Sequence, residues 1–519
     1  MKKYLAFLVL IVCLSILAKS SFAEDQLLQQ NNLIYQGAFR VPFSGTGPCS
    51  GSGGHMIAYN PTGNSGAGSL FIISGPGGPT TGCSQFAEIT IPNPICLDAS
   101  GRATSCTNYT ILSSALVNNV SNLNAASLLQ NFVDDTYGNQ EKVGGSSTSN
   151  VLNTGILVYN GKLIASTKIY YDANLSQQYT HFTNSTNLSI NNFSGYYKID
   201  SGVLSGFNSG AMCLIPLGYR AQLGGPVITG QSPGTGIVTS LSYGPCAIVF
   251  DPDNLVPANL PPAAVPATPL SYYTESHHLP GGYWGASQQS NIYTSPSDQI
   301  NGVVFPDNTR SVLFFGSHGL SSTTGYACYG AGTTNPNESC AASYVTTWGP
   351  KCVANVSTCN GAIMSSGEVD NDGCCYDPQN SSKGPHSYPY VNYVWAYDAG
   401  DSSGNNSPGN RVSSLNSANP GKNNYTAVKL GLIKPYEILP YATWTFTLPT
   451  IGELSGVKYG NFSGAAWDPT HQVIYVTQPG ADCDGNGCFP LVHVYKVTTS
   501  LQPQQPSPPP PGGVRLINP

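Results

Sequence analysis

The chain has 519 residues, of which 9% are charged and 40% apolar, with 31 Tyr, 17 Phe and 5 Trp. This aromatic and aliphatic content supplies a large core and excludes disorder caused by excess charge. A net charge of −6 with only 20 basic residues also excludes a nucleic-acid binder, which needs a basic surface to neutralise phosphates. The 58 Gly and 40 Pro residues predict many turns and few long helices.

Residues 1–23 read as a secretory signal peptide. A basic start, Met1-Lys2-Lys3, precedes an apolar run over residues 4–17, and small residues stand at Ser21 and Ala23, as in a cleavage site. The apolar run is too short to span a bilayer, so we expect no membrane insertion. The sequence predicts a secreted protein, located in the periplasm, on the cell surface or outside the cell.

Residues 24–498 contain a loose repeat of a small residue, a short apolar strand, an Asn- or Asp-containing turn and a second apolar strand. Copies start at residues 54, 155, 246, 302 and 464, and further strands are expected at 86–92, 393–399 and 492–497. Turns of this composition between β-rich runs are typical of hairpins. The repeat therefore predicts an all-β domain with one antiparallel sheet per copy.

Such sheets form a sandwich, a solenoid or a propeller. We favour a single β-propeller, because its closed ring leaves few strand edges exposed and its two faces accept long loops. We expect five to seven four-stranded blades: five can be read from the repeat, and up to two more would lie within 200–245 and 425–450. The strand at 32–39 would close the ring beside the last blade.

Three segments lie outside this pattern. Residues 320–385 contain six cysteines with little strand pattern, which predicts a disulfide-rich loop insertion. Residues 399–425 are rich in Gly, Ser and Asn and predict a mobile loop. Residues 499–519 form a proline-rich tail, read either as a tether or as a simple extension.

Fourteen of the 15 cysteines follow the signal peptide and fall into even-numbered local groups. This arrangement predicts disulfide bonds in an oxidising compartment, with connectivity left open. A zinc site is less consistent with the sequence, since no Cys-x-x-Cys pair occurs. The groups are Cys49, Cys83, Cys96 and Cys106; Cys213 and Cys246; Cys328, Cys340, Cys352, Cys359, Cys374 and Cys375; Cys483 and Cys488.

Several phrases resemble a group of secreted, propeller-like bacterial proteins of uncharacterised function. They are YQGAFRVP (35–42), GILVYNGKLIAS (155–166), GVVFPDNTRSVLFFGSHG (302–319), CYDPQNSSKGPHSYPYVNYVWAYD (375–398) and GAAWDPTHQVIYV (464–476). The resemblance covers most of the mature chain and implies a propeller fold and export. It assigns no activity.

Two acidic loops are candidate calcium sites, because carboxylate and amide oxygens at alternate positions before a glycine suit a hard cation. The candidate ligands are Asp482, Asp484 and Asn486 in one loop, and Glu368, Asp370, Asp372 and Asp377 in the other. The first loop lacks the acidic residue that closes a typical calcium loop, and Cys483 and Cys488 offer a disulfide-closed turn instead. The second is alternatively an acidic loop in contact with water.

Histidines beside Gly or Pro are the candidate catalytic groups. His278, His318 and His386, with Tyr388, would act as acid and base or bind a metal if their loops met on one face. Histidines in turns or packed in the interior are the alternative. No HExxH motif occurs.

The leading interpretation is a secreted, disulfide-stabilised propeller that binds a protein or carbohydrate ligand and is stabilised by calcium. The alternatives are a propeller hydrolase or lyase acting on polysaccharide, and a structural surface or matrix protein. A pocket joining the three histidines favours the enzyme, whereas an aromatic face without them favours the binder. The small number of carboxylates also predicts resistance to acid, since acid unfolding largely follows carboxylate protonation.

Overall fold

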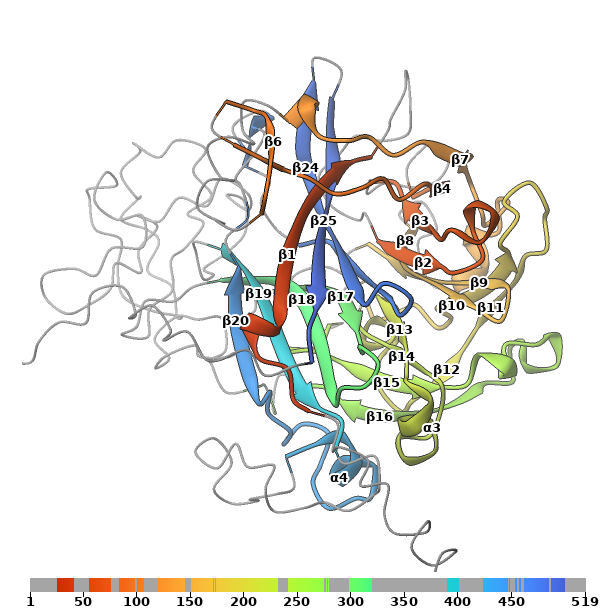
Figure 1. Ribbon diagram of the computed structural model, residues 1–519. Helices are drawn as coiled ribbons and strands as arrows, with labels where there is room; N and C mark the ends of the chain where they lie inside the picture. The colour runs from red at the N-terminus through yellow and green to blue at the C-terminus, as the bar shows by residue number, and fades with distance from the viewer. Residues whose placement is uncertain are drawn as a thin grey trace, which may run out of the picture.

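The computed structural model contains five small antiparallel sheets arranged in a ring, a five-bladed β-propeller (Figure 1). It describes residues 26–41, 56–75, 84–98, 100–106, 120–144, 151–170, 172, 174–231, 241–274, 277, 279, 298–319, 390–400, 423–446, 448, 453–454, 457–458, 462–484 and 487–499. The predicted signal peptide, the insertion at 320–385, most of the loop at 399–425 and nearly all of the proline-rich tail lie outside these residues.

In blades 1, 2 and 4 the strands follow one another in sequence order from the ring centre outwards, whereas the outermost strands of blades 3 and 5 come from earlier in the chain. Blade 1 consists of β2 (Ile57–Asn60), β3 (Ser69–Ile73), β4 (Phe86–Ile89) and β7 (Leu128–Val133). Blade 2 consists of β8 (Val151–Tyr159), β9 (Lys162–Ile169), β10 (His181–Ser185) and β11 (Ser194–Tyr197). Blade 3 consists of β13 (Met212–Leu214), β14 (Val227–Thr229), β15 (Ala247–Phe250) and β16 (Val265–Ser271), with β12 (Ile199–Asp200) added parallel to β16.

Blade 4 consists of β17 (Gln299–Val304), β18 (Ser311–Gly319), β19 (Tyr390–Asp398) and β20 (Ala442–Phe446). Blade 5 consists of β23 (Gly464–Asp468), β24 (Val473–Asp484), β25 (Gly487–Val497) and β1 (Leu33–Arg40). Two hairpins stand apart: β5 (Cys96–Leu97) with β6 (Ala103–Thr104), and β21 (Glu453–Leu454) with β22 (Val457–Lys458).

The helices of the described part are short. The two α-helices are α3 (Leu217–Leu223) and α4 (Tyr425–Lys429). Single 3-10 turns span Gln30–Asn32, Asn64–Gly66, Val120–Asn122, Gln140–Val143, Ser205–Phe207, Pro252–Asn254 and Pro257–Asn259. None of the helices described here has the length and apolarity to cross a membrane.

The ring closes as predicted, through the N-terminal strand. β1 pairs antiparallel with β25 from Leu33↔Val497 to Arg40↔Leu491, so the two ends of the propeller domain lie side by side. The ladder shifts register at Gly37, whose φ is +112°. A Cβ at this position would lie 2.5 Å from the backbone of Ile95, so only glycine fits without strain.

The period-two alternation of the strands explains how the ring is held together. Along β24, Ile474 and Val476 pack towards blade 4, whereas Val473 and Tyr475 pack towards blade 1. The same alternation in the other blades divides the buried apolar residues into five clusters, one at each interface between neighbouring blades. Both faces of each sheet are therefore buried, which accounts for the strongly apolar strands.

The number of blades is the lowest of the expected five to seven, and one detail of the predicted organisation is wrong. There are five blades, because 200–245 contains β13 and β14 of blade 3 and 425–450 contains α4 and β20 of blade 4. The repeat copy at residue 246 is β15, the third strand of its blade and not the first. The inner strand of blade 3 has only three residues and leads into α3, so its pattern is too short to recognise.

Candidate functional site

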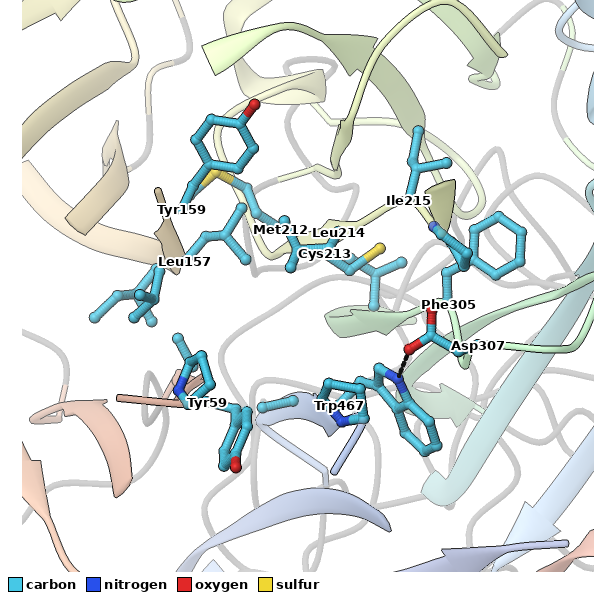
Figure 2. Close-up of a pocket in the computed structure, with 18 of the residues that line it drawn as sticks. Tyr59, Leu157, Tyr159, Met212, Cys213, Leu214, Ile215, Phe305, Asp307 and Trp467 are labelled. Atoms are coloured by element: carbon cyan, nitrogen blue, oxygen red, sulfur yellow. Dashed lines mark hydrogen bonds between the residues drawn. The ribbon is translucent and has the colours of Figure 1, made fainter. Parts of the chain in front are cut away.

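A cavity of about 500 Å³ opens at the centre of the ring, where the innermost strands of all five blades end. These strands, β2, β8, β13, β17 and β23, contact one another in a closed circle. Figure 2 shows side chains from all five blades arranged around the central space. Because every blade contributes, the cavity exists only in the closed propeller.

Large side chains at the end of each inner strand form the rim. Tyr59, Tyr159, Leu214, Phe305 and Trp467 come from blades 1 to 5 in that order. Deeper lining residues are almost all apolar and buried: Ile57, Ala58, Ile156, Leu157, Val158, Met212, Val303, Ala465 and Ala466. The cavity therefore has an apolar interior and an aromatic entrance, the usual character of a small-molecule site.

Few polar groups reach this cavity. The Trp467 indole Nε1 donates to Asp307 Oδ2 at 2.9 Å, which joins blades 5 and 4. Arg220, on α3, donates from Nε to the carbonyl of Ile215 at 2.8 Å. These contacts fix the positions of one carboxylate and one guanidinium at the rim.

Tyr159 lies between charged groups of both signs. Its hydroxyl approaches Asp253 Oδ2 at 3.4 Å. Partial burial, together with Asp253 and Asp251, raises the pKa of Tyr159, and Arg220 opposes this shift. The Tyr159 hydroxyl is therefore a neutral group at physiological pH.

The arrangement is suited to binding and shows little of what catalysis needs. Among the described lining residues only Asp307 carries a carboxylate, whereas most glycoside hydrolases use two. Cys213 lines the cavity as a free thiol, and burial raises its pKa far above the ordinary value. It is therefore not a thiolate nucleophile near neutral pH.

His318 is the one predicted catalytic residue that the structure describes, and it lies outside the cavity lining. It is buried on β18, with Nδ1 at 2.9 Å from both carboxylate oxygens of Asp298. Its ring packs against Tyr393 at 4.6 Å between centroids. His278, His386 and Tyr388 lie outside the described residues, so whether the histidine loops converge stays a prediction.

Of the predicted calcium ligands, only Asp482 has a described side chain. Its carboxylate accepts hydrogen bonds from Arg40 Nε at 2.7 Å and Nη2 at 3.3 Å. The two residues form an ion pair between β24 and β1, in which Asp482 is buried and Arg40 is partly exposed. This pairing satisfies both oxygens without a metal. Among the described residues, no group of three or more His, Cys, Asp or Glu side chains is placed to hold a metal ion.

The other predicted ligands are not described. Asp484 ends β24, but its side chain is outside the described set, as are Asn486, Glu368, Asp370, Asp372 and Asp377 entirely. Calcium binding therefore remains a prediction. The backbone pairs Cys483 directly with Cys488 across the β24–β25 hairpin, as the alternative of a closed turn requires.

The cysteine predictions are partly confirmed. Cys96 and Cys106 form a disulfide. Cys213 and Cys246 are both free and buried, so their expected pairing is wrong. Cys213 lies opposite Ile228, which lies opposite Val249, three residues beyond Cys246; this offset places the two Cα atoms roughly 14 Å apart, twice the reach of a disulfide.

Sequence analysis missed the cavity, although the repeat carried its signal. Four of the five rim residues stand near the end of a short apolar strand just before a turn: Tyr59, Tyr159, Phe305 and Trp467. The fifth, Leu214, follows the unrecognised inner strand of blade 3. Aligning the repeat copies by their turns would have shown large side chains recurring at one level of the ring.

Comparison with known proteins gives weak likenesses only. A luciferin-regenerating enzyme aligns over 85% of this chain and 78% of its own, with 8% identity and a TM-score of 0.28. A structure described under the GH130 family of mannoside phosphorylases, which contains glycoside hydrolases that target β-1,2-mannosidic linkages in Candida mannan, aligns over 91% and 96%, with 9% identity and a TM-score of 0.32. No protein-family model matches this sequence, and neither does any curated protein.

Proposed function

We propose that this protein is a secreted β-propeller that binds a ligand in its central cavity. The observation that carries the proposal is the cavity itself, an apolar space of about 500 Å³ to which all five blades contribute, with large side chains at its rim that are aromatic in four of the five blades. A volume of this size lies in the range of small-molecule sites. Binding is favoured over catalysis because the described lining offers one carboxylate and no activated nucleophile.

Two leucines beside the entrance support the proposal. Leu214 is 40% exposed and Leu217, on α3, is 81% exposed, and both line the cavity. Scattered exposed apolar residues are normal on a protein surface. Here the exposed leucines continue the apolar lining outwards, so that a bound ligand would cover them.

The test uses an uncharged fluorescent probe, N-phenyl-1-naphthylamine, with the purified full-length protein. We expect saturable binding at one site and a weaker affinity in the Leu214→Asp variant, which places a charge at the entrance. Leu204→Asp is the matched control, because Leu204 is similarly exposed, at 38%, and does not line the cavity. Absence of saturable binding, or equal weakening by both substitutions, would refute the proposal.

A further inference from the structure

Arg220 is the one cationic side chain among the described residues of the cavity lining. It is half-buried, and its Nε is fixed by the carbonyl of Ile215. Within the described part of the chain, its terminal N–H groups have no acceptor, and no carboxylate forms an ion pair with it. A guanidinium held at one nitrogen presents the remaining donors as a planar fork.

The carboxylates around this edge of the cavity form hydrogen bonds with groups other than Arg220. Asp307 accepts the Trp467 indole. Asp253 is approached by the Tyr159 hydroxyl, and Asp251 accepts from the backbone N–H of Asp253. The polar edge of the cavity therefore has unused donors at Arg220, and the group that complements them is an acceptor, most favourably an anionic one.

The surroundings of Arg220 define the rest of the ligand. Leu217 precedes it by one helical turn, and Met212, Leu214 and Ile215 line the adjoining wall. A ligand that reaches the guanidinium thus lies against apolar side chains over the remainder of its length. A ligand that lies against these side chains shields the guanidinium from water, so a charge-assisted hydrogen bond there is stronger than at an open surface.

We infer that the ligand is an amphipathic carboxylate, with its apolar body in the central cavity and its carboxylate on Arg220. This inference rests on the proposed function, since it names the chemical class that the same cavity binds. Arg220 acts as a specificity-determining residue, because it selects among apolar ligands by their head group. The planar fork of the guanidinium fits a carboxylate through two parallel hydrogen bonds.

The test compares 2-naphthoate with 2-naphthamide, two probes with the same ring system that differ in charge, by isothermal titration calorimetry of the full-length protein. We expect the carboxylate to bind about tenfold more tightly than the amide, as one charge-assisted pair would give. Arg220→Gln should abolish this preference, chiefly by weakening naphthoate binding, because glutamine carries no charge to pair with the carboxylate. Arg220→Lys should retain part of it, because the charge remains and the fork is lost.

Arg102→Gln is the matched control, since Arg102 is exposed and lies outside the cavity lining; it should leave both affinities unchanged. Binding of both probes with equal affinity to the native protein, or an unchanged preference in Arg220→Gln, overturns the inference and leaves the proposed function standing. Binding of neither probe refutes both. The far-UV circular dichroism spectrum reports whether each variant is folded, so a loss of structure is distinguished from a loss of the head-group contact.

Discussion

Acidification should destabilise this protein through two histidines in its interior. His181, on β10, and His493, on β25, are both fully buried. His493 lies between the Tyr35 hydroxyl, 2.9 Å from Nδ1, and Gln478 Oε1, 2.8 Å from Nε2. A single neutral tautomer satisfies both contacts, with Nδ1 accepting from Tyr35 and Nε2 donating to Gln478.

His181 is held in the neutral form by a different environment. Its Nδ1 contacts Thr180 Oγ1 at 2.8 Å, its ring packs edge-on against Phe250, and its Nε2 has no partner among the described residues. A second N–H would therefore be buried without an acceptor. Burial lowers the pKa of both His181 and His493 to about 3.

The sign and size of the effect follow from proton linkage. The unfolded chain takes up protons at these histidines below about pH 6.5, whereas the folded chain does not until about pH 3. Above about pH 6.5 the two histidines are neutral in both states and do not lower the free energy of unfolding. As the pH falls below this value, only the unfolded chain gains protons at these positions, so the free energy of unfolding decreases. Each histidine costs about 1.4 kcal/mol per pH unit within that window, so the pair costs about 2.7 kcal/mol per unit.

Asp135 acts in the opposite direction. It is fully buried beside Asp134, and burial, followed by the charge of Asp134, raises its pKa to about 8. An acid with a raised folded pKa stabilises the protein at low pH, and that stability is lost as the pH rises through 8. Its contribution offsets one histidine, so we expect a net loss of about 1.4 kcal/mol per unit from pH 6.5 down to about 4 and a stability maximum near pH 6.5.

Urea unfolding at half-unit steps between pH 4 and 8 measures these slopes. His181→Met removes one of the two buried histidines, so that the effect of His493 and the opposite effect of Asp135 cancel. The stability of this variant should therefore be nearly independent of pH between 4 and 6.5. His277→Gln, at an exposed histidine, is the control and should keep the native slope. Stability that rises steadily towards pH 4 in the native protein, or an unchanged slope in His181→Met, would refute the reasoning.

Three further substitutions test the architecture by chemical denaturation at neutral pH. Cys96→Ala opens a disulfide with a sequence separation of 10 and should cost about 2 to 3 kcal/mol; equal stability in a reducing buffer and an oxidising one would contradict this. Arg310→Met leaves the buried Asp398 without its two guanidinium hydrogen bonds and should cost about 3 to 5 kcal/mol; an unchanged denaturation midpoint would contradict this. Gly37→Ala brings a methyl group against the Ile95 backbone and should cost more than about 1 kcal/mol; a stabilised variant would show that the ring-closing strand does not need this bulge.

Local patterns were sufficient to predict the blades. Strands such as β4, β19 and β25 were expected from period-two alternation, and ring closure by β1 was expected from an isolated strand near the N-terminus. Both kinds of signal are contained within a few residues of sequence. The acid resistance predicted from composition was less secure, since it counted carboxylates and could not anticipate which histidines the packing would bury.

The inner strand of blade 3 shows where such patterns become insufficient. It has three residues, and a helix replaces the tight turn that follows the inner strands of other blades. A strand this short shows no periodicity, so the repeat is first recognisable in this blade at β15, two strands further out and apolar on both faces. The grouping of Cys213 with Cys246 rested on their order along the chain, which does not show the two strand spacings that separate these residues.

The cavity depends on geometry that no single repeat contains. Tyr59 and Trp467 are 408 positions apart in the sequence, yet both line the same entrance, because each stands at the same level of its own inner strand. In an open sheet or a solenoid these side chains would point along an extended surface. Closure of the ring by β1 turns five repeated strand ends into one enclosed site, so a variant that weakens the β1–β25 pairing should lose ligand binding before the individual blades unfold.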